Sequence, residues 1–505
     1  MRNSVGKSTL LITASKLASL GINMACVMVL SRIRTLDEYG TYSQLLLAIN
    51  LVSMLFIMGL PNSINYFLAR EESAEGKRAY LSHYFTLNLL LSAFAGVVLF
   101  LSVPVLERYF HNDAIGTYSF FLLLYPFASI TMSAVESMLV VYERPRTLVL
   151  YRLLNSLSLL GILFAADALG MTFRQYMVLF LLTELLFALA VYVIAGRLAG
   201  GLRLAFSAAK LREIAVFCIP IGLASAVGTL SAELDKLVIS AFFSTSDYAI
   251  YTNAAKELPL TVLSSATTMV IMPKIVRHLH RGEAERAISL WKDAFVLNYA
   301  VMAVMVFGIV TYAPEVITIL YSEKYLPGVT VFRIYTLILL LRTTYFGMIL
   351  NATGNTKYIF RVSVAQLCVN VVLNLIGCRW LGFIGPAVAT VIVSFMGAAL
   401  LSCRTGKLLN IPPRSVIPWR ELLSITAVNF LFAAVFTVAK RMLPLELWVG
   451  ALFRAVASER ISTAALGECT ESILLGAVWS LLYFMLLSRF LKRKWNEINR
   501  SGEVQ

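Results

Sequence analysis

Fourteen apolar stretches of membrane-spanning length divide this chain of 505 residues. A helix needs about 20 apolar residues to cross a bilayer core of roughly 30 Å. The sequence therefore predicts an all-α polytopic membrane protein with about 14 transmembrane helices. The predicted spans are 8–30, 41–61, 80–103, 117–141, 147–168, 175–196, 213–241, 248–272, 293–313, 330–351, 358–378, 383–403, 421–441 and 470–491.

The lysine and arginine residues fall mainly on alternate sides of these spans. With the N-terminus in the cytoplasm, 28 of the 43 lie in cytoplasmic segments, 11 lie on the opposite side and four lie within spans. Such a bias is what the positive-inside rule produces. Because the number of spans is even, both termini are predicted to be cytoplasmic.

The composition excludes a water-soluble domain, since 59% of the residues are hydrophobic and only 14% are charged. The formal net charge is +15, and its cations are scattered over short cytoplasmic loops. That distribution favours anionic membrane lipid as a partner and argues against nucleic acid.

The sequence predicts no cofactor and no metal site. Its six cysteines contain no CxxC and lie mostly within spans, which is typical of small buried hydrophobic side chains. Cys378 and Cys469 both fall on the outer side, and the spacing leaves open whether they pair. His278 and His280 form an HxH without a nearby third ligand.

A short repeat suggests an internal duplication. SRIRTLDEYGTY (31–42) joins the first two spans, and SAFFSTSDYAIY (240–251) joins the seventh and eighth, 209 residues later. An offset of six helices is even, so the copies would insert in the same direction around a central substrate site. Chance similarity of two loops is the alternative. The duplication predicts an N-lobe of helices 1–6 (1–203), a C-lobe of helices 7–12 (204–411) and a C-terminal part with helices 13–14 and a basic tail (412–505).

Several cations lie within predicted spans, at a membrane depth where a charged side chain costs free energy. An ionisable side chain within a span costs roughly 2.5–3.5 kcal/mol, so it normally faces protein or a water-filled cavity. Lys16 and Lys256 each sit about eight residues into a span, roughly 12 Å deep. We expect both to face a shared central cavity and to bind an anionic headgroup such as a diphosphate, with Arg342 as a third substrate-binding candidate. Glu136 could neutralise Arg144 or Arg342.

The acidic residues within spans are candidates for ion coupling or for pairing with these cations. Glu184 is central in the sixth span, Glu233 and Asp235 lie toward the outer end of the seventh, and Glu257 follows Lys256. Asp235 and the adjacent Lys236 could instead snorkel to the interface. Glu257 could be a structural partner of a cation on another helix.

Two motifs carry a resemblance to a known family. SRIRTLDEYGTYS (31–43) resembles the helix 1–2 signature of bacterial polysaccharide (O-antigen-type) flippases, which belong to the multidrug, oligosaccharidyl-lipid and polysaccharide exporter superfamily. NVVLNLIGCRWLGFIGPAVAT (370–390) resembles the family's Asn-rich helix 11 and its glycine-containing entry into helix 12, with Gly382 and Gly385 at matching places.

The resemblance implies translocation of an undecaprenyl-diphosphate-linked oligosaccharide from the cytoplasmic to the outer leaflet of a bacterial inner membrane by alternating access. Its partners would be the lipid-linked oligosaccharide and, as further candidates, a glycan polymerase and glycosyltransferases. Peptidoglycan-precursor flippases are relatives with cations in helices 1 and 8, where Lys16 and Lys256 stand here. A flippase of that kind is therefore an alternative.

Two other function classes are competitors. A drug/cation antiporter would be expected to have an acidic cavity, which the predicted mid-membrane lysines do not favour. A membrane-embedded glycan polymerase or ligase would need a large outer loop and a nucleophile–base constellation, and the sequence displays neither. The sizeable outer segment 441–470 instead has the pattern of an interfacial amphipathic helix. The sequence thus predicts a transporter and not an enzyme.

Overall fold

The computed structural model describes residues 2–57, 59–442 and 463–502, and within these ranges it contains helices and no β-strand. Thirteen candidate membrane spans lie in the described residues, and the longest, Thr356–Leu409, holds two helices, α18 (Thr356–Leu381) and α19 (Gly385–Leu409). Each of the 14 predicted spans therefore coincides with helical segments, which confirms the polytopic all-α fold. Residues 443–462, where most of the interfacial helix was predicted, lie outside the description.

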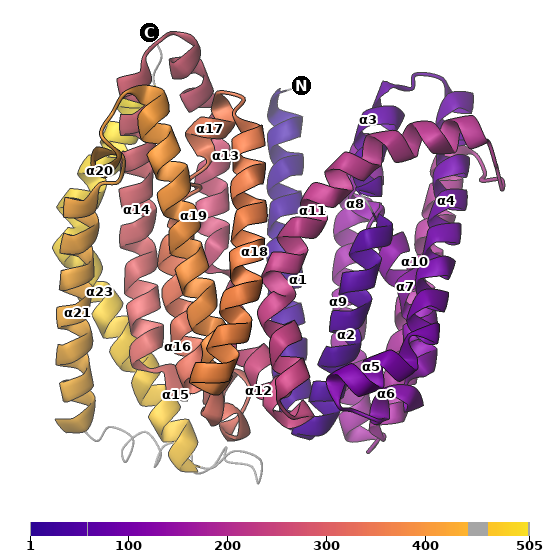
Figure 1. Cartoon of the computed structure of the whole chain (residues 1–505), viewed down its shortest axis with the longest axis horizontal. Coiled ribbons are helices and arrows are strands. Elements are labelled where there is room, and N and C mark those ends of the chain that lie inside the picture. Colours follow the sequence, from indigo (N-terminus) through magenta and orange to yellow (C-terminus); the bar gives the residue numbers. More distant parts are fainter. Residues whose placement is uncertain (1, 58, 443–462, 503–505) are drawn as a thin grey trace. The chain divides into compact units, whose positions relative to one another are not determined.

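The chain packs as two compact units, Met1–Ala249 and Ile250–Gln505. In the first unit α1 packs along α9, α4 and α10 pack against α7, and α11 packs against α2 (Figure 1). Its helices are α1 (Arg2–Ile33), α2 (Leu36–Ile57), α3 (Leu60–Phe67), α4 (Ala74–Leu101), α5 (Val103–Phe110), α6 (Ala114–Thr117), α7 (Ser119–Met132), α8 (Val135–Val141), α9 (Pro145–Ala168), α10 (Phe173–Ala199) and α11 (Ala208–Phe242). The boundary between the units falls within α12 (Thr245–Ala254). The lobes defined by the repeat, with a boundary at 203/204, stay a prediction.

The second unit is organised around α14 (Ala284–Thr311), which packs against α13, α21 and α23 (Figure 1). Trp291 and Phe295 of α14 are buried in its core. The other elements of this unit are η2 (Pro259–Thr261), α13 (Val262–His280), α15 (Ala313–Leu320), η3 (Glu323–Gly328), α16 (Val329–Ile338), η4 (Leu339–Thr343), α17 (Met348–Ala352), α18, α19, α20 (Pro413–Val416), α21 (Trp419–Met442) and α23 (Thr463–Gly502).

The repeat corresponds to two helices that begin in the same way. At the start of α2 the Thr35 hydroxyl accepts a hydrogen bond from the Glu38 amide (3.2 Å), and the Glu38 carboxylate accepts one from the Thr35 amide. At the start of α12 the Ser244 hydroxyl accepts from the Asp247 amide (3.1 Å) and donates to the Asp247 carboxylate. Side chains that bond the free amides of a first turn stabilise a helix start. The shared sequence pattern is therefore a pair of helix caps.

The two helix starts also contact each other within the first unit. The Ser246 hydroxyl donates to Asp37 Oδ1 (2.7 Å), and these two residues are 209 positions apart. A Cβ atom added to Gly40 would lie 2.3 Å from the carbonyl oxygen of Thr245. Glycine in the first copy of the repeat thus permits this close approach of the backbones.

The glycines of the second motif have two distinct roles. Gly382 adopts a positive φ of 60° between α18 and α19, a conformation that favours glycine. A Cβ atom on Gly385 would lie 2.0 Å from the carbonyl oxygen of Gly377. Small residues at such a crossing let two membrane helices approach closely. All six cysteines are described and are free thiols, so Cys378 and Cys469 are not joined in this structure.

Candidate functional site

Two predicted spans of the second unit are interrupted. The eighth span leaves the helical conformation after α12, at residues 256–258, and resumes as η2 and α13. The tenth span passes from α16 into η4 and then loses regular structure until α17 begins at Met348. Irregular backbone at membrane depth is tolerated where protein buries it or where it lines a water-filled cavity. Transporters place substrate and ion sites at such discontinuous helices.

An ion pair joins the two interruptions. Arg342 of η4 pairs through its guanidinium with the carboxylate of Glu257, and η2 packs against η4. The prediction that Glu257 partners a cation on another helix is confirmed. The side chains are 33% and 42% exposed for Glu257 and Arg342, so the pair is accessible. Lys256, which directly precedes Glu257 in the chain, is also exposed.

A buried amide supports the second interruption. Asn298 of α14 is 5% exposed and donates from Nδ2 to the carbonyl oxygen of Thr343 (3.1 Å). The Oδ1 atom of Asn298 accepts from the Thr267 hydroxyl of α13 (2.9 Å). A buried carbonyl needs a donor when the helix no longer supplies one, and Asn298 provides it. Sequence reasoning missed Asn298, although an amide within the apolar run of the ninth span was a signal.

Lys16 lies in the first unit, on the exposed side of α1. That helix packs mainly along α9. Among the described residues no carboxylate pairs with Lys16, whereas Lys236 pairs with Glu233. Lys16 and Lys256 belong to different units, and a cavity shared by them stays a proposal.

Glu184 forms a separate polar site inside the first unit. Its side chain is 5% exposed on α10, and its Oε1 atom accepts from Nδ2 of Asn155 on α9 (2.9 Å). Tyr42 and Tyr125 lie near enough to interact with it electrostatically. A buried carboxylate with a neutral amide donor can exchange a proton or bind a cation, and the coupling role of Glu184 stays a prediction. Sequence reasoning did not identify Asn155.

The acidic residues of α11 differ in their surroundings. Glu233 Oε2 lies 2.7 Å from Lys236 Nζ, one helical turn away, and both side chains are largely buried. Asp235 is 3% exposed. The snorkelling alternative is therefore wrong for Asp235, because its side chain is enclosed by protein.

The prediction that Glu136 neutralises Arg144 or Arg342 is wrong. Glu136 of α8 pairs with Arg152 of α9. These two helices pack against each other, and Arg152 lies on the contacting helix. Spacing along the chain does not reveal which helices meet.

The HxH motif at 278–280 makes a local polar contact. His278 Nδ1 lies 2.6 Å from Glu283 Oε2. This hydrogen bond, together with the charge of Arg286, holds the pKa of Glu283 below its ordinary value. Within the described ranges no three His, Cys, Asp or Glu side chains are grouped to hold a metal ion.

Comparison with known proteins gives a family match and several distant relatives. A family model described as "Polysaccharide biosynthesis protein" matches residues 29–330. The "Probable lipid II flippase MurJ" of Chlamydia trachomatis is 26% identical over 202 residues, covering 38% of this chain and 37% of the relative. The "Probable low-salt glycan biosynthesis flippase Agl15" of Haloferax volcanii is 22% identical over 230 residues, covering 45% and 48%. The chain thus spans about a third to a half of the length of the curated relatives it matches.

Solved structures extend the likeness over nearly the whole chain. The lipid II flippase MurJ in an inward closed conformation has a TM-score of 0.67 at 14% identity, covering 95% of this chain and 99% of that chain. An inward-facing multidrug resistance transporter of the MATE family and the MOP superfamily has a TM-score of 0.57 at 17% identity, covering 77% and 94%. At these identities the likeness establishes the fold.

Proposed function

The chain belongs to the polysaccharide biosynthesis protein family, and from this membership we propose that it is a lipid-linked oligosaccharide flippase. It would move an undecaprenyl-diphosphate-linked oligosaccharide from the cytoplasmic to the outer leaflet of a bacterial inner membrane. The two lobes defined by the repeat would alternate access, with both termini in the cytoplasm. Glycosyltransferases would assemble this oligosaccharide before translocation, and a glycan polymerase would act on it afterwards.

The observation that supports this proposal is that two exposed cations belong to the interrupted spans. Lys256 directly precedes Glu257 in the chain, and Arg342 is the accessible partner of Glu257. A diphosphate is a polyanion that lysine and arginine bind through charge-assisted hydrogen bonds. Lys16, an exposed cation at comparable predicted depth in the first unit, would supply the second contact.

A peptidoglycan-precursor lipid flippase is the second candidate. Two lines favour it: the named lipid II flippases among the relatives and the fold match over most of the chain. That cargo is also a lipid diphosphate, so the same cations would serve it. A drug/cation antiporter fits less well, because Lys16, Lys256 and Arg342 are cations where a cationic drug would need acidic groups.

Complementation of a flippase-deficient strain, with the membrane abundance of each variant measured in parallel, tests the cation site. Lys256→Gln and Lys16→Gln should each lower glycan export severalfold with normal membrane abundance, because an exposed cation contributes little to packing. Lysine-to-arginine variants should retain more export, since arginine keeps the charge and can bind two phosphate oxygens. Lys357→Gln, which removes an exposed cytoplasmic cation, is the matched control and should export normally.

Arg342 needs a different design because it has a protein partner. Arg342→Gln would leave Glu257 unpaired, which would lower abundance if the pair is only structural. The double variant with Glu257→Gln would then restore both abundance and export. If Arg342 binds cargo, the double variant should recover abundance and still fail to export. Full export by the Lys16→Gln, Lys256→Gln double variant would refute the diphosphate site.

Complementation of two different recipient strains distinguishes the two candidate cargoes. Restoration of surface glycan in a strain lacking its O-antigen-type flippase supports the first proposal. Rescue of growth in a strain depleted of its lipid II flippase, without glycan export, would favour the second candidate.

A further inference from the structure

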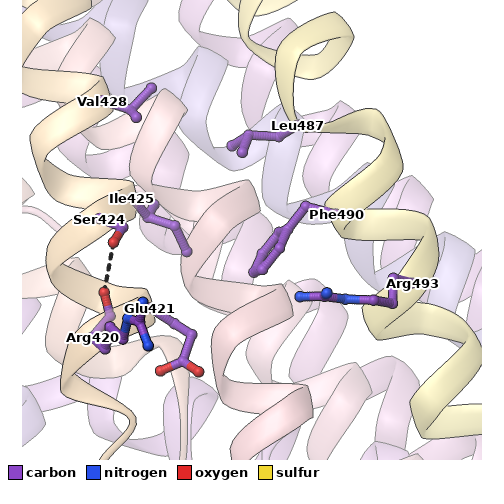
Figure 2. A pocket seen from close by; sticks show the side chains of 8 residues that line it. All are labelled: Arg420, Glu421, Ser424, Ile425, Val428, Leu487, Phe490 and Arg493. Atoms are coloured by element: carbon purple, nitrogen blue, oxygen red, sulfur yellow. Dashed lines mark hydrogen bonds between the residues drawn. The ribbon is translucent and has the colours of Figure 1, made fainter.

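A groove between α21 and α23 has a charge pattern that the proposed transport site does not use. Its cavity volume is about 360 Å³, within the range of small-molecule sites. Figure 2 shows the charged side chains gathered at one end and the apolar ones extending from it along both helices. The lining residues are Arg420, Glu421, Ser424, Ile425 and Val428 of α21 and Leu487, Phe490 and Arg493 of α23.

Aromatic residues place the charged end at a membrane–water interface. Trp419 precedes Arg420 on α21 and is 50% exposed, and Trp495 lies two residues beyond Arg493 on α23 and is 56% exposed. Tryptophan is enriched at the level of lipid headgroups. The positive-inside bias assigns this end to the cytoplasmic leaflet, where anionic lipids attract basic segments.

The two arginines are available to a ligand. Among the described residues Arg420 has no ion-pair partner. Arg493 is 66% exposed in its side chain and lies 3.8 Å from Glu497, while the neighbouring Lys494 is held by Asp293 at 2.7 Å. The guanidinium of Arg493 also lies over the ring of Phe490, 5.6 Å from its centroid, which orients it at the groove.

The carboxylate at the same end does not cancel these charges. Glu421 lies close enough to Lys292 of α14 for electrostatic interaction. Asp293 and Glu497 are further carboxylates nearby, and both pair with Lys494. The cations Arg420, Arg493, Lys292 and Lys494 outnumber the carboxylates Glu421, Asp293 and Glu497 by one. The end of the groove therefore has an excess of positive charge next to an apolar wall, and this is the pattern that complements an anionic amphiphile.

We propose that this groove binds an anionic phospholipid of the cytoplasmic leaflet. Its phosphate would lie between Arg420 and Arg493, which suit phosphate because a guanidinium can donate two parallel hydrogen bonds. One acyl chain would follow Ile425, Leu487 and Phe490. Basic pockets between transmembrane helices on the cytoplasmic side bind lipid headgroups in this way. The inference does not depend on the identity of the cargo, because it concerns helices outside the predicted lobes.

Native mass spectrometry of the purified full chain tests the site, with phosphatidylglycerol and phosphatidylcholine as probes. Wild-type protein should retain phosphatidylglycerol preferentially. The double variant Arg420→Gln, Arg493→Gln should lose about tenfold in affinity for it, equivalent to about 1.4 kcal/mol, and should bind phosphatidylcholine as before. Arg414→Gln with Lys492→Gln removes two nearby exposed cations outside the groove and should behave as wild type.

A second variant separates the groove from general surface charge. Leu487→Trp fills the apolar part and leaves both arginines in place, so it should also reduce phosphatidylglycerol binding. Undiminished binding by the double arginine variant or by Leu487→Trp, or equal affinity of the wild type for both lipids, would overturn the proposal. Preference of the groove for undecaprenyl diphosphate over phosphatidylglycerol would also overturn it, by assigning the groove to cargo.

Discussion

Replacing Lys440 by methionine should destabilise the second unit, because it leaves Glu315 without its cation. Lys440 of α21 forms an ion pair with Glu315 of α15 and donates to the Ser472 hydroxyl of α23 at 3.3 Å. The side chains are 22% exposed for Lys440 and 13% for Glu315. One ammonium group thus connects three helices in a largely dehydrated place.

The expected loss is about 3 kcal/mol at pH 7, at the low end of the cost of removing one member of a buried ion pair. The magnitude follows from the low exposure of Glu315 (13%), because a buried charge that loses its partner keeps its desolvation cost.

Unfolding in mixed micelles of increasing SDS content measures this loss. Trp479 of α23 is buried with its ring 5.5 Å from that of Phe436 on α21, so its fluorescence reports separation of these helices. Arg441→Met changes the adjacent exposed residue and should cost no more than about 0.5 kcal/mol.

The double variant Lys440→Met, Glu315→Leu should recover most of the stability, because apolar replacement of a whole buried pair is often neutral. It should remain about 0.3–1 kcal/mol below wild type, since Glu315 occupies the first turn of α15 and favours its dipole. A Lys440→Met penalty equal to that of Arg441→Met, or no recovery of stability in the double variant, would refute the reasoning.

Three further outcomes are expected. Glu184→Gln should abolish gradient-dependent transport while cargo binding persists, and normal driven transport would place coupling elsewhere. Gly385→Ala should cost about 1–3 kcal/mol in the same unfolding assay, because the added carbon meets backbone at 2.0 Å, whereas Gly21→Ala has open space and should not destabilise. An impermeant thiol reagent on intact cells should label Ser244→Cys and spare Ser73→Cys, and the reverse pattern would invert the predicted topology.

The spans could be predicted because apolar length is a local property of the chain. All 14 coincide with helical segments. The interruption at 256–258 has a local signal, because Lys256, Glu257 and Pro259 fall together there, whereas the one after Thr343 lies within a stretch of apolar length and could not be located in this way. The second interruption is stabilised by Asn298, a side chain from another helix that donates to the buried carbonyl oxygen of Thr343. Such tertiary hydrogen bonds override the conformation that the local sequence pattern favours.

The candidate site could likewise be predicted only in part. Depth along a helix placed Lys256 and Glu257 within the membrane, and the type of partner expected for Glu257 was correct. The sequence did not identify which residues pair, because Glu136 pairs with Arg152 and not with either of the predicted partners. A pair requires two helices to meet with matching faces, and neither periodicity nor charge count specifies which helices are neighbours.

The two copies of the repeat bond the amides of their own helix starts, so parting them would strand neither of these amides. Contacts between the copies hold them together. The hydrogen bond from Ser246 to Asp37 is exposed to solvent and contributes about 1 kcal/mol, whereas the buried Tyr248 hydroxyl donates to the carbonyl oxygen of Ser43 at 3.4 Å. The duplicated ends therefore depend on the close approach at Gly40, and a side chain at that position would separate them without breaking either helix cap.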